Sequence, residues 1–123
     1  AIAAKSLKEV RYHFQHAADW LVRFGDGTDE SHARAQAAVD FLMPYTQEFW
    51  SEWPVSQAIF GDVNALHSAW HDLVQQVLSG AGLQSPAAAG YITQGHLGVH
   101  SEHMSYLLAE MQSLARQHPG ATW

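Results

Sequence analysis

The sequence predicts an all-α protein with about four helices. Apolar residues recur at steps of three and four along its 123 residues, which is the spacing of one face of an α-helix. The alternation typical of a half-buried strand is absent from the first such segment. Glycine, proline and capping residues separate the periodic segments. A chain of this length is expected to form a single domain over residues 1–123.

The first two helices are predicted to form a tight hairpin around the sequence GDGT. The first helix should run over about residues 2–24, with Gly25 as the residue that ends it. Thr28 or Asp29 is the expected N-cap of the second helix, and Asp29 and Glu30 then lie in a first turn whose dipole favours acids. The apolar stripe of the first helix consists of Leu7, Val10, Phe14, Ala17 and Leu21.

The second helix is expected to carry Ala35, Ala38, Val39 and Leu42 on its apolar face. It then meets Pro44 and continues through YTQEFWSEW until Pro54 ends it. Because proline lacks the backbone N–H and clashes with the preceding turn, Pro44 should kink the helix or split it.

A third helix should follow the connector VSQAIFGD, with Asp62 as its N-cap and its end at SGAG. Its apolar face consists of Val63, Leu66, Trp70, Leu73 and Val77. Residues 79–98 are rich in glycine and predict a long, contact-making loop.

Ser101 is the expected cap of the last helix, which His118, Pro119 and Gly120 should end. The apolar face of this helix consists of Met104, Leu107, Leu108, Met111, Leu114 and Ala115.

Composition narrows the classes of function. The chain has no cysteine, so any metal must be held by His, Asp or Glu. The net charge of −6 and the lack of a basic stretch argue against nucleic-acid binding. With no apolar run of about 20 residues and no signal-peptide pattern, the sequence predicts a soluble, cytoplasmic protein. The sequence does not begin with Met, and its first residues already show the spacing of a helix. This predicts that residue 1 lies inside a longer protein.

One face of the first helix invites a comparison with metal sites. At 100° per residue, Glu9, His13, His16 and Trp20 fall within about 60° of one another, away from the aliphatic stripe. Helical di-iron sites use a Glu from each of two helices and a Glu-x-x-His pair from each of two others. Tyr12 occupies the position three after Glu9, so that pair is missing. The set is either the relic of a metal site or a polar seam where a Glu–His pair lies beside Trp20.

The hairpin geometry tests which residues could complete such a site. Asp29 and His32 should lie roughly 15–20 Å along the axis from Glu9, too far to share a metal. The residues level with Glu9 fall near Asp40 and Met43. Met43 stands where a histidine would be needed, so we expect a defective half-site.

Two further histidine sets are weaker candidates for metal ligands. His67 and His71 are four apart, but Ser68 stands where a zinc-binding His-Glu-x-x-His helix has its glutamate. The segment GHLGVHSEH contributes His96, His100 and His103, with Glu102 among them. Gly95 and Gly98 make a regular helix unexpected there, which favours loop ordering and capping over a metal or anion site.

The tryptophans are expected to be core or contact anchors. Trp20 shares the polar face of the first helix, and Trp123 is the last residue of the sequence. We predict that both lie at an interface; the alternative for Trp123 is a groove of its own chain.

Residues 10–40 and 100–123 carry a resemblance to a known family. The stretches RFGDGTDES and HSEHMSYLLAEMQ and the terminal PGATW occur in this order. With the sequence around them they resemble the C-subunit, PaaC-type, of the bacterial phenylacetyl-CoA 1,2-epoxidase, also called phenylacetate-CoA oxygenase. The family's subunit is about twice this length, and the chain resembles its C-terminal half.

The resemblance implies a ferritin-like helical bundle, of which this chain would supply about four helices. It also implies a structural subunit without a catalytic residue or metal of its own, which pairs with a catalytic A-subunit and stabilises it. That A-subunit holds the di-iron centre, and a separate reductase supplies electrons. The alternative is a metalloprotein that binds iron or zinc through its Glu and His clusters. Because half of a bundle exposes apolar surface, we also expect a homo-oligomer of this chain.

Overall fold

The computed structural model describes residues 2–51, 58–59, 61–86 and 93–122, and within them the fold is all-α. Four α-helices and two short 3-10 helices are present in these ranges, with one isolated bridge and no strand. The prediction of an all-α chain is confirmed, and this fold is consistent with part of a ferritin-like bundle. Contacts divide the chain into two compact units, Ala1–Ile92 and Thr93–Trp123. The single-domain expectation stays a prediction.

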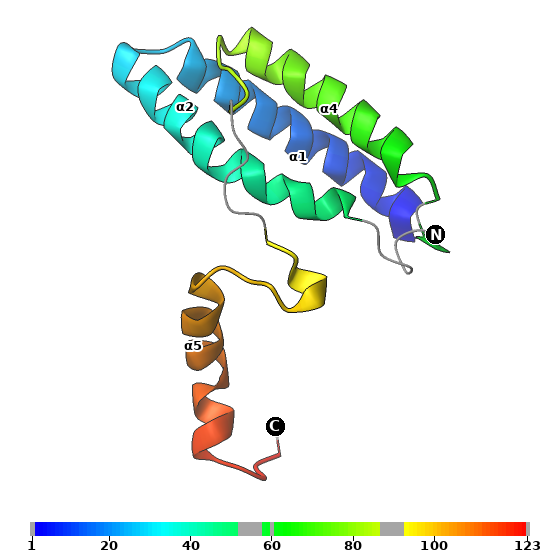
Figure 1. Ribbon diagram of the computed structural model, residues 1–123, viewed down its shortest axis with the longest axis vertical. Helices are drawn as coiled ribbons and strands as arrows, with labels where there is room; N and C mark the ends of the chain where they lie inside the picture. The colour runs from blue at the N-terminus through cyan, green and yellow to red at the C-terminus, as the bar shows by residue number, and fades with distance from the viewer. Residues whose placement is uncertain (1, 52–57, 60, 87–92, 123) are drawn as a thin grey trace. The chain divides into compact units, whose positions relative to one another are not determined.

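Helices α1 (Ile2–Gly25) and α2 (Asp29–Leu42) form the predicted hairpin. Figure 1 shows them side by side and antiparallel. The N-cap is Thr28, whose Oγ1 accepts a hydrogen bond from the backbone N–H of Ser31 at 3.2 Å. Both acids, Asp29 and Glu30, lie in the first turn of α2. Local capping chemistry therefore fixed this turn as the sequence predicts.

Gly25 is the last residue of α1, as predicted, and packing leaves no room for a side chain there. Its backbone is not in the left-handed region. Among the described residues, that region is occupied by Gly61, Gly82, Gly98 and Gly120. A Cβ at Gly25 would collide with the carbonyl oxygen of Ala81 and lie 2.9 Å from the Ala81 Cβ. In addition, the Nδ1 of His32 lies 2.7 Å from the Gly25 carbonyl oxygen. The end of α1 is thus held between α2 and the residues that follow α4.

Pro44 splits the second helical segment, as expected. Helix α2 stops at Leu42, and a 3-10 helix, Met43–Trp50, takes its place with Pro44 in the first turn. Pro44 is buried. The predicted end of this segment at Pro54 lies outside the described residues.

Helix α4 (Val63–Gly80) starts and ends as predicted. Its N-cap is Asp62, whose carboxylate accepts from the backbone N–H of Asn64 at 2.9 Å and of Ala65 at 3.3 Å. Figure 1 shows α4 beside α1 and running in the same direction.

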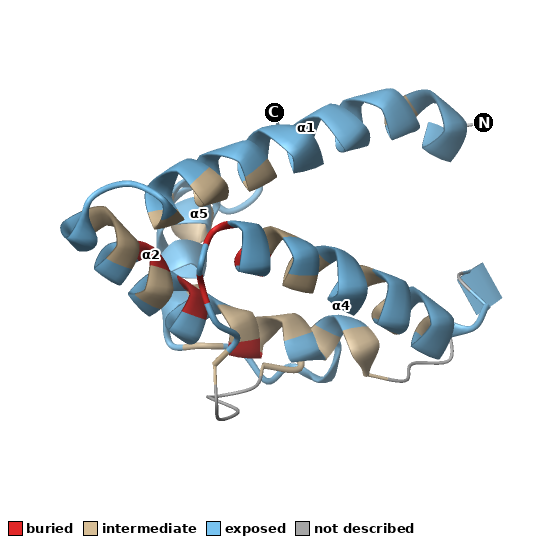
Figure 2. Cartoon of the chain, turned by 90° about the horizontal axis from the view of Figure 1, so that it is seen from above, coloured by how far each residue is buried: buried red, intermediate tan, exposed pale blue. Residues whose placement is uncertain are grey.

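The core of the first unit is small and lies where the C-terminal parts of α1 and α4, with the segment after α4, pack against α2. Its buried residues are Ala35, Val39, Leu78, Ala81 and Leu83. In Figure 2 these residues are red, and most of the remaining helical ribbon is pale blue, the colour of exposed residues. Much of the apolar surface predicted to face a core is therefore open, including Leu7 and Val10 on α1.

The second unit contains a short 3-10 helix, Gly95–Leu97, and helix α5 (His103–Gln117). The expected cap at Ser101 is wrong, because α5 starts at His103 after Glu102, and no side chain caps it. Instead, the backbone carbonyl of Ser101 accepts from the N–H of Met104 at 3.1 Å. The C-terminal end is as predicted, with His118 following the last helical residue.

A side-chain clamp joins α2 to the segment after α4. The amide of Gln36 donates to the backbone carbonyl of Gln84 at 2.9 Å and accepts from the backbone N–H of Gln84 at 2.9 Å. The same Nε2 also donates to Asp40 at 2.9 Å. Gln36 thereby satisfies both backbone groups of a residue 48 positions away.

Replacing Gln36 by Glu is expected to destabilise the first unit by about 1–3 kcal/mol. The carboxylate lacks the Nε2 donor, so the Gln84 carbonyl loses its partner, and a second negative charge is placed beside Asp40. Urea denaturation followed by tryptophan fluorescence measures the change. Gln76→Glu, at an exposed position on α4, is the control and should stay within about 0.5 kcal/mol of the native chain. Equal stability of both variants would contradict the clamp.

Candidate functional site

One face of α1 carries a row of four rings spaced four residues apart, which we call the aromatic ladder: Tyr12, His16, Trp20 and Phe24. Tyr12 and His16 stack with their ring centroids 6.1 Å apart, and Trp20 lies 6.4 Å from His16 and 5.5 Å from Phe24. The guanidinium of Arg23 sits 5.2 Å from the centroid of the Trp20 ring. Side chains four apart are neighbours on a helix surface. The ring contacts of the ladder therefore all lie within α1.

Glu9, His13 and His16 share this face, and all three side chains are exposed. His16 is held between the rings of Tyr12 and Trp20, whereas His13 lies edge-on to Tyr12. Across the ranges that the structure describes, no three His, Asp or Glu side chains come together closely enough to hold a metal ion. Among the described residues, Glu9, His13 and His16 are therefore not joined by a third ligand from another element.

The residues expected level with Glu9 make contacts with other parts of the first unit. Asp40 is exposed and accepts a hydrogen bond from Gln36, whereas Met43 packs against the buried core. His32, which the sequence placed too far away, is engaged with Gly25. Asp40, Met43 and His32 each make a contact within the first unit.

His67 belongs to an aromatic cluster with Trp50 and Trp70. Its ring stacks on Trp50 at 4.7 Å, and Trp50 lies 5.2 Å from Trp70. His71 lies 6.4 Å from His67, edge to face, and its Nδ1 is 3.8 Å from the Asp72 carboxylate. The cluster joins α4 to the 3-10 helix that follows α2, which supports the structural interpretation of these histidines.

The histidines of the second unit lie on a turn and at a helix start. His96 is in the 3-10 helix, and Gly98 follows with φ 78° in the left-handed region, so the regular helical spacing is interrupted as expected. His96, His100 and His103 are all exposed. Trp123, the other predicted interface anchor, lies outside the described residues.

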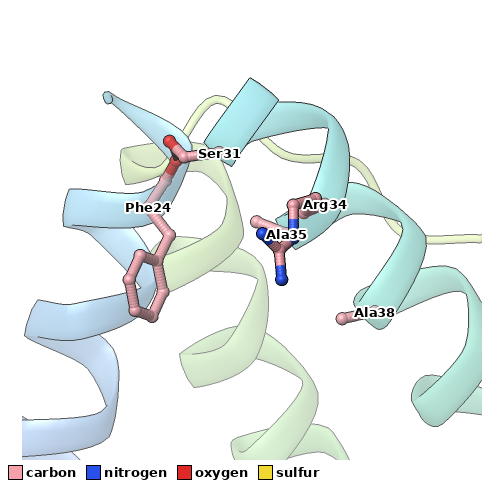
Figure 3. A pocket seen from close by; sticks show the side chains of 5 residues that line it. All are labelled: Phe24, Ser31, Arg34, Ala35 and Ala38. Atoms are coloured by element: carbon pink, nitrogen blue, oxygen red, sulfur yellow. Dashed lines mark hydrogen bonds between the residues drawn. The ribbon is translucent and has the colours of Figure 1, made fainter. Parts of the chain in front are cut away.

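A shallow cavity lies between α1 and α2 beside the aromatic ladder. Its volume is about 370 Å³, and Figure 3 shows its lining: Phe24, Ser31, Arg34, Ala35 and Ala38. Phe24 is also the last ring of the ladder, so the cavity lies at the end of the ladder that is next to α2. The small side chains of Ala35 and Ala38 leave this space open.

Helix α5 exposes most of its apolar face. Leu107, Met111 and Leu114 are each more than half exposed, although they share one side of the helix. No helix in the described part of the chain is long and apolar enough to cross a membrane. Because its apolar side chains are exposed, this face of α5 is a candidate contact surface for another protein.

Sequence reasoning missed the long-range contacts that hold the first unit together. The Gln36 clamp joins residues 48 positions apart, and the stack of Trp50 on His67 joins two different elements. A glutamine on a helix and a histidine beside a tryptophan carry no local pattern that indicates such partners.

Comparison with known proteins places the chain in a family. A family model described as phenylacetic acid catabolic protein matches residues 1–123. The chain is 38% identical over 128 residues to the C-subunit of 1,2-phenylacetyl-CoA epoxidase of Escherichia coli (strain K12). This alignment covers 100% of the chain and 52% of that relative, so the chain spans about half of the relative's length. The resemblance expected from RFGDGTDES and HSEHMSYLLAEMQ is confirmed, and the chain belongs to the phenylacetic acid catabolic protein family.

Proposed function

We propose that the chain is part of a structural, non-catalytic subunit of a multicomponent di-iron monooxygenase that epoxidises the ring of phenylacetyl-CoA. Its task would be to pair with the catalytic A-subunit and stabilise it in phenylacetate degradation. The observation that carries this proposal is the 38% identity, over the whole chain, to a protein named as the C-subunit of that epoxidase. A cytoplasmic location and a reductase that acts on the assembled complex belong to the same proposal.

The geometry of α1 supports the non-catalytic part of the proposal. The residues that could be ligands, Glu9, His13 and His16, are exposed, and His16 is engaged in ring contacts. In this proposal the di-iron centre belongs to the A-subunit, and this chain supplies no ligand to it. Lys5, Lys8 and Arg11, all exposed on α1, are too few to argue for a phosphate site of CoA.

The exposed face of α5 supports the pairing part. An open row of Leu and Met side chains has the apolar character found at the centre of stable interfaces. We therefore assign the contact with the A-subunit to the face that carries Leu107 and Met111.

Leu107→Asp is expected to weaken binding of the chain to the A-subunit by at least about 10-fold, because a carboxylate would be desolvated in the contact. The measurement is co-purification and titration calorimetry with an A-subunit of the same complex. Ala109→Asp, exposed on the opposite side of α5, is the matched control and should bind like the native chain. Equal loss in both variants would mean that the helix, and not its apolar face, is affected.

Elemental analysis of the separated proteins tests the metal assignment. Iron at about two per A-subunit, with none that is stoichiometric in this chain, is the expected result. Two irons bound to this chain alone would overturn the proposed non-catalytic role.

A further inference from the structure

We draw no further inference here: the strongest candidate, the polar cavity of about 430 Å³ between α2 and the segment after α4 that is lined by His32, Gln36 and Asp40, opens on the surface of a chain that spans about half of its relative's length, and nothing in the structure shows what covers it.

Discussion

Replacing Leu78 by Ala is expected to lower the free energy of unfolding of the first unit by about 2–5 kcal/mol. Leu78 is 2% exposed and is the largest aliphatic side chain, with Leu83, among the buried residues of the core. Truncation removes its apolar contacts and leaves a cavity between α1, α2 and α4. Since this core is so small, few other contacts offset the loss.

The matched control lies on the same helix. Leu73 is 41% exposed, so Leu73→Ala removes the same atoms from a surface that water already reaches, and it should cost about 1 kcal/mol or less. Urea unfolding followed by fluorescence reports on this unit, because Trp20, Trp50 and Trp70 all lie in it. Equal losses in both variants would mean that Leu78 is not the centre of the core.

Replacing Gly25 by Ala is expected to destabilise the first unit by about 1–3 kcal/mol, and by more if the backbone cannot shift. The new Cβ meets the carbonyl oxygen of Ala81, which is backbone and cannot rotate away. To make room, α1 must move away from the end of α4, which also disturbs the contact between His32 and the Gly25 carbonyl.

Gly80→Ala is the opposite case and serves as control. Gly80 is helical, and a Cβ there would meet Val22 Cγ2 at 3.9 Å, an ordinary contact. Alanine is the better helix former, so this variant should gain up to about 1 kcal/mol. Thermal melts of both variants should therefore shift in opposite directions. A Gly25→Ala variant that melts like the native chain would show that the α1–α4 contact is looser than described.

The predicted elements and the observed ones agree where short-range chemistry decides. Thr28 and Asp62 cap the helices assigned to them, and Pro44 ends α2 because its ring excludes a continuing helix. The start of α5 is the exception: Ser101 offers a hydroxyl, but its backbone carbonyl takes part in the turn and its side chain caps nothing. A capping residue permits a helix to start and does not by itself fix where it starts.

The sequence alone determined the all-α class, the helical hairpin around GDGT, the family and the common face of Glu9, His13, His16 and Trp20, because each depends on spacing within one segment. Only the tertiary structure decided why residue 25 has no room for a side chain, which side chain clamps Gln84 and how His67 stacks on Trp50. These contacts join residues far apart in the chain, and no local pattern encodes the partner of a residue 48 positions away. The structure also determined how little of the apolar surface is buried, since burial depends on which elements meet and not on the periodicity that forms them.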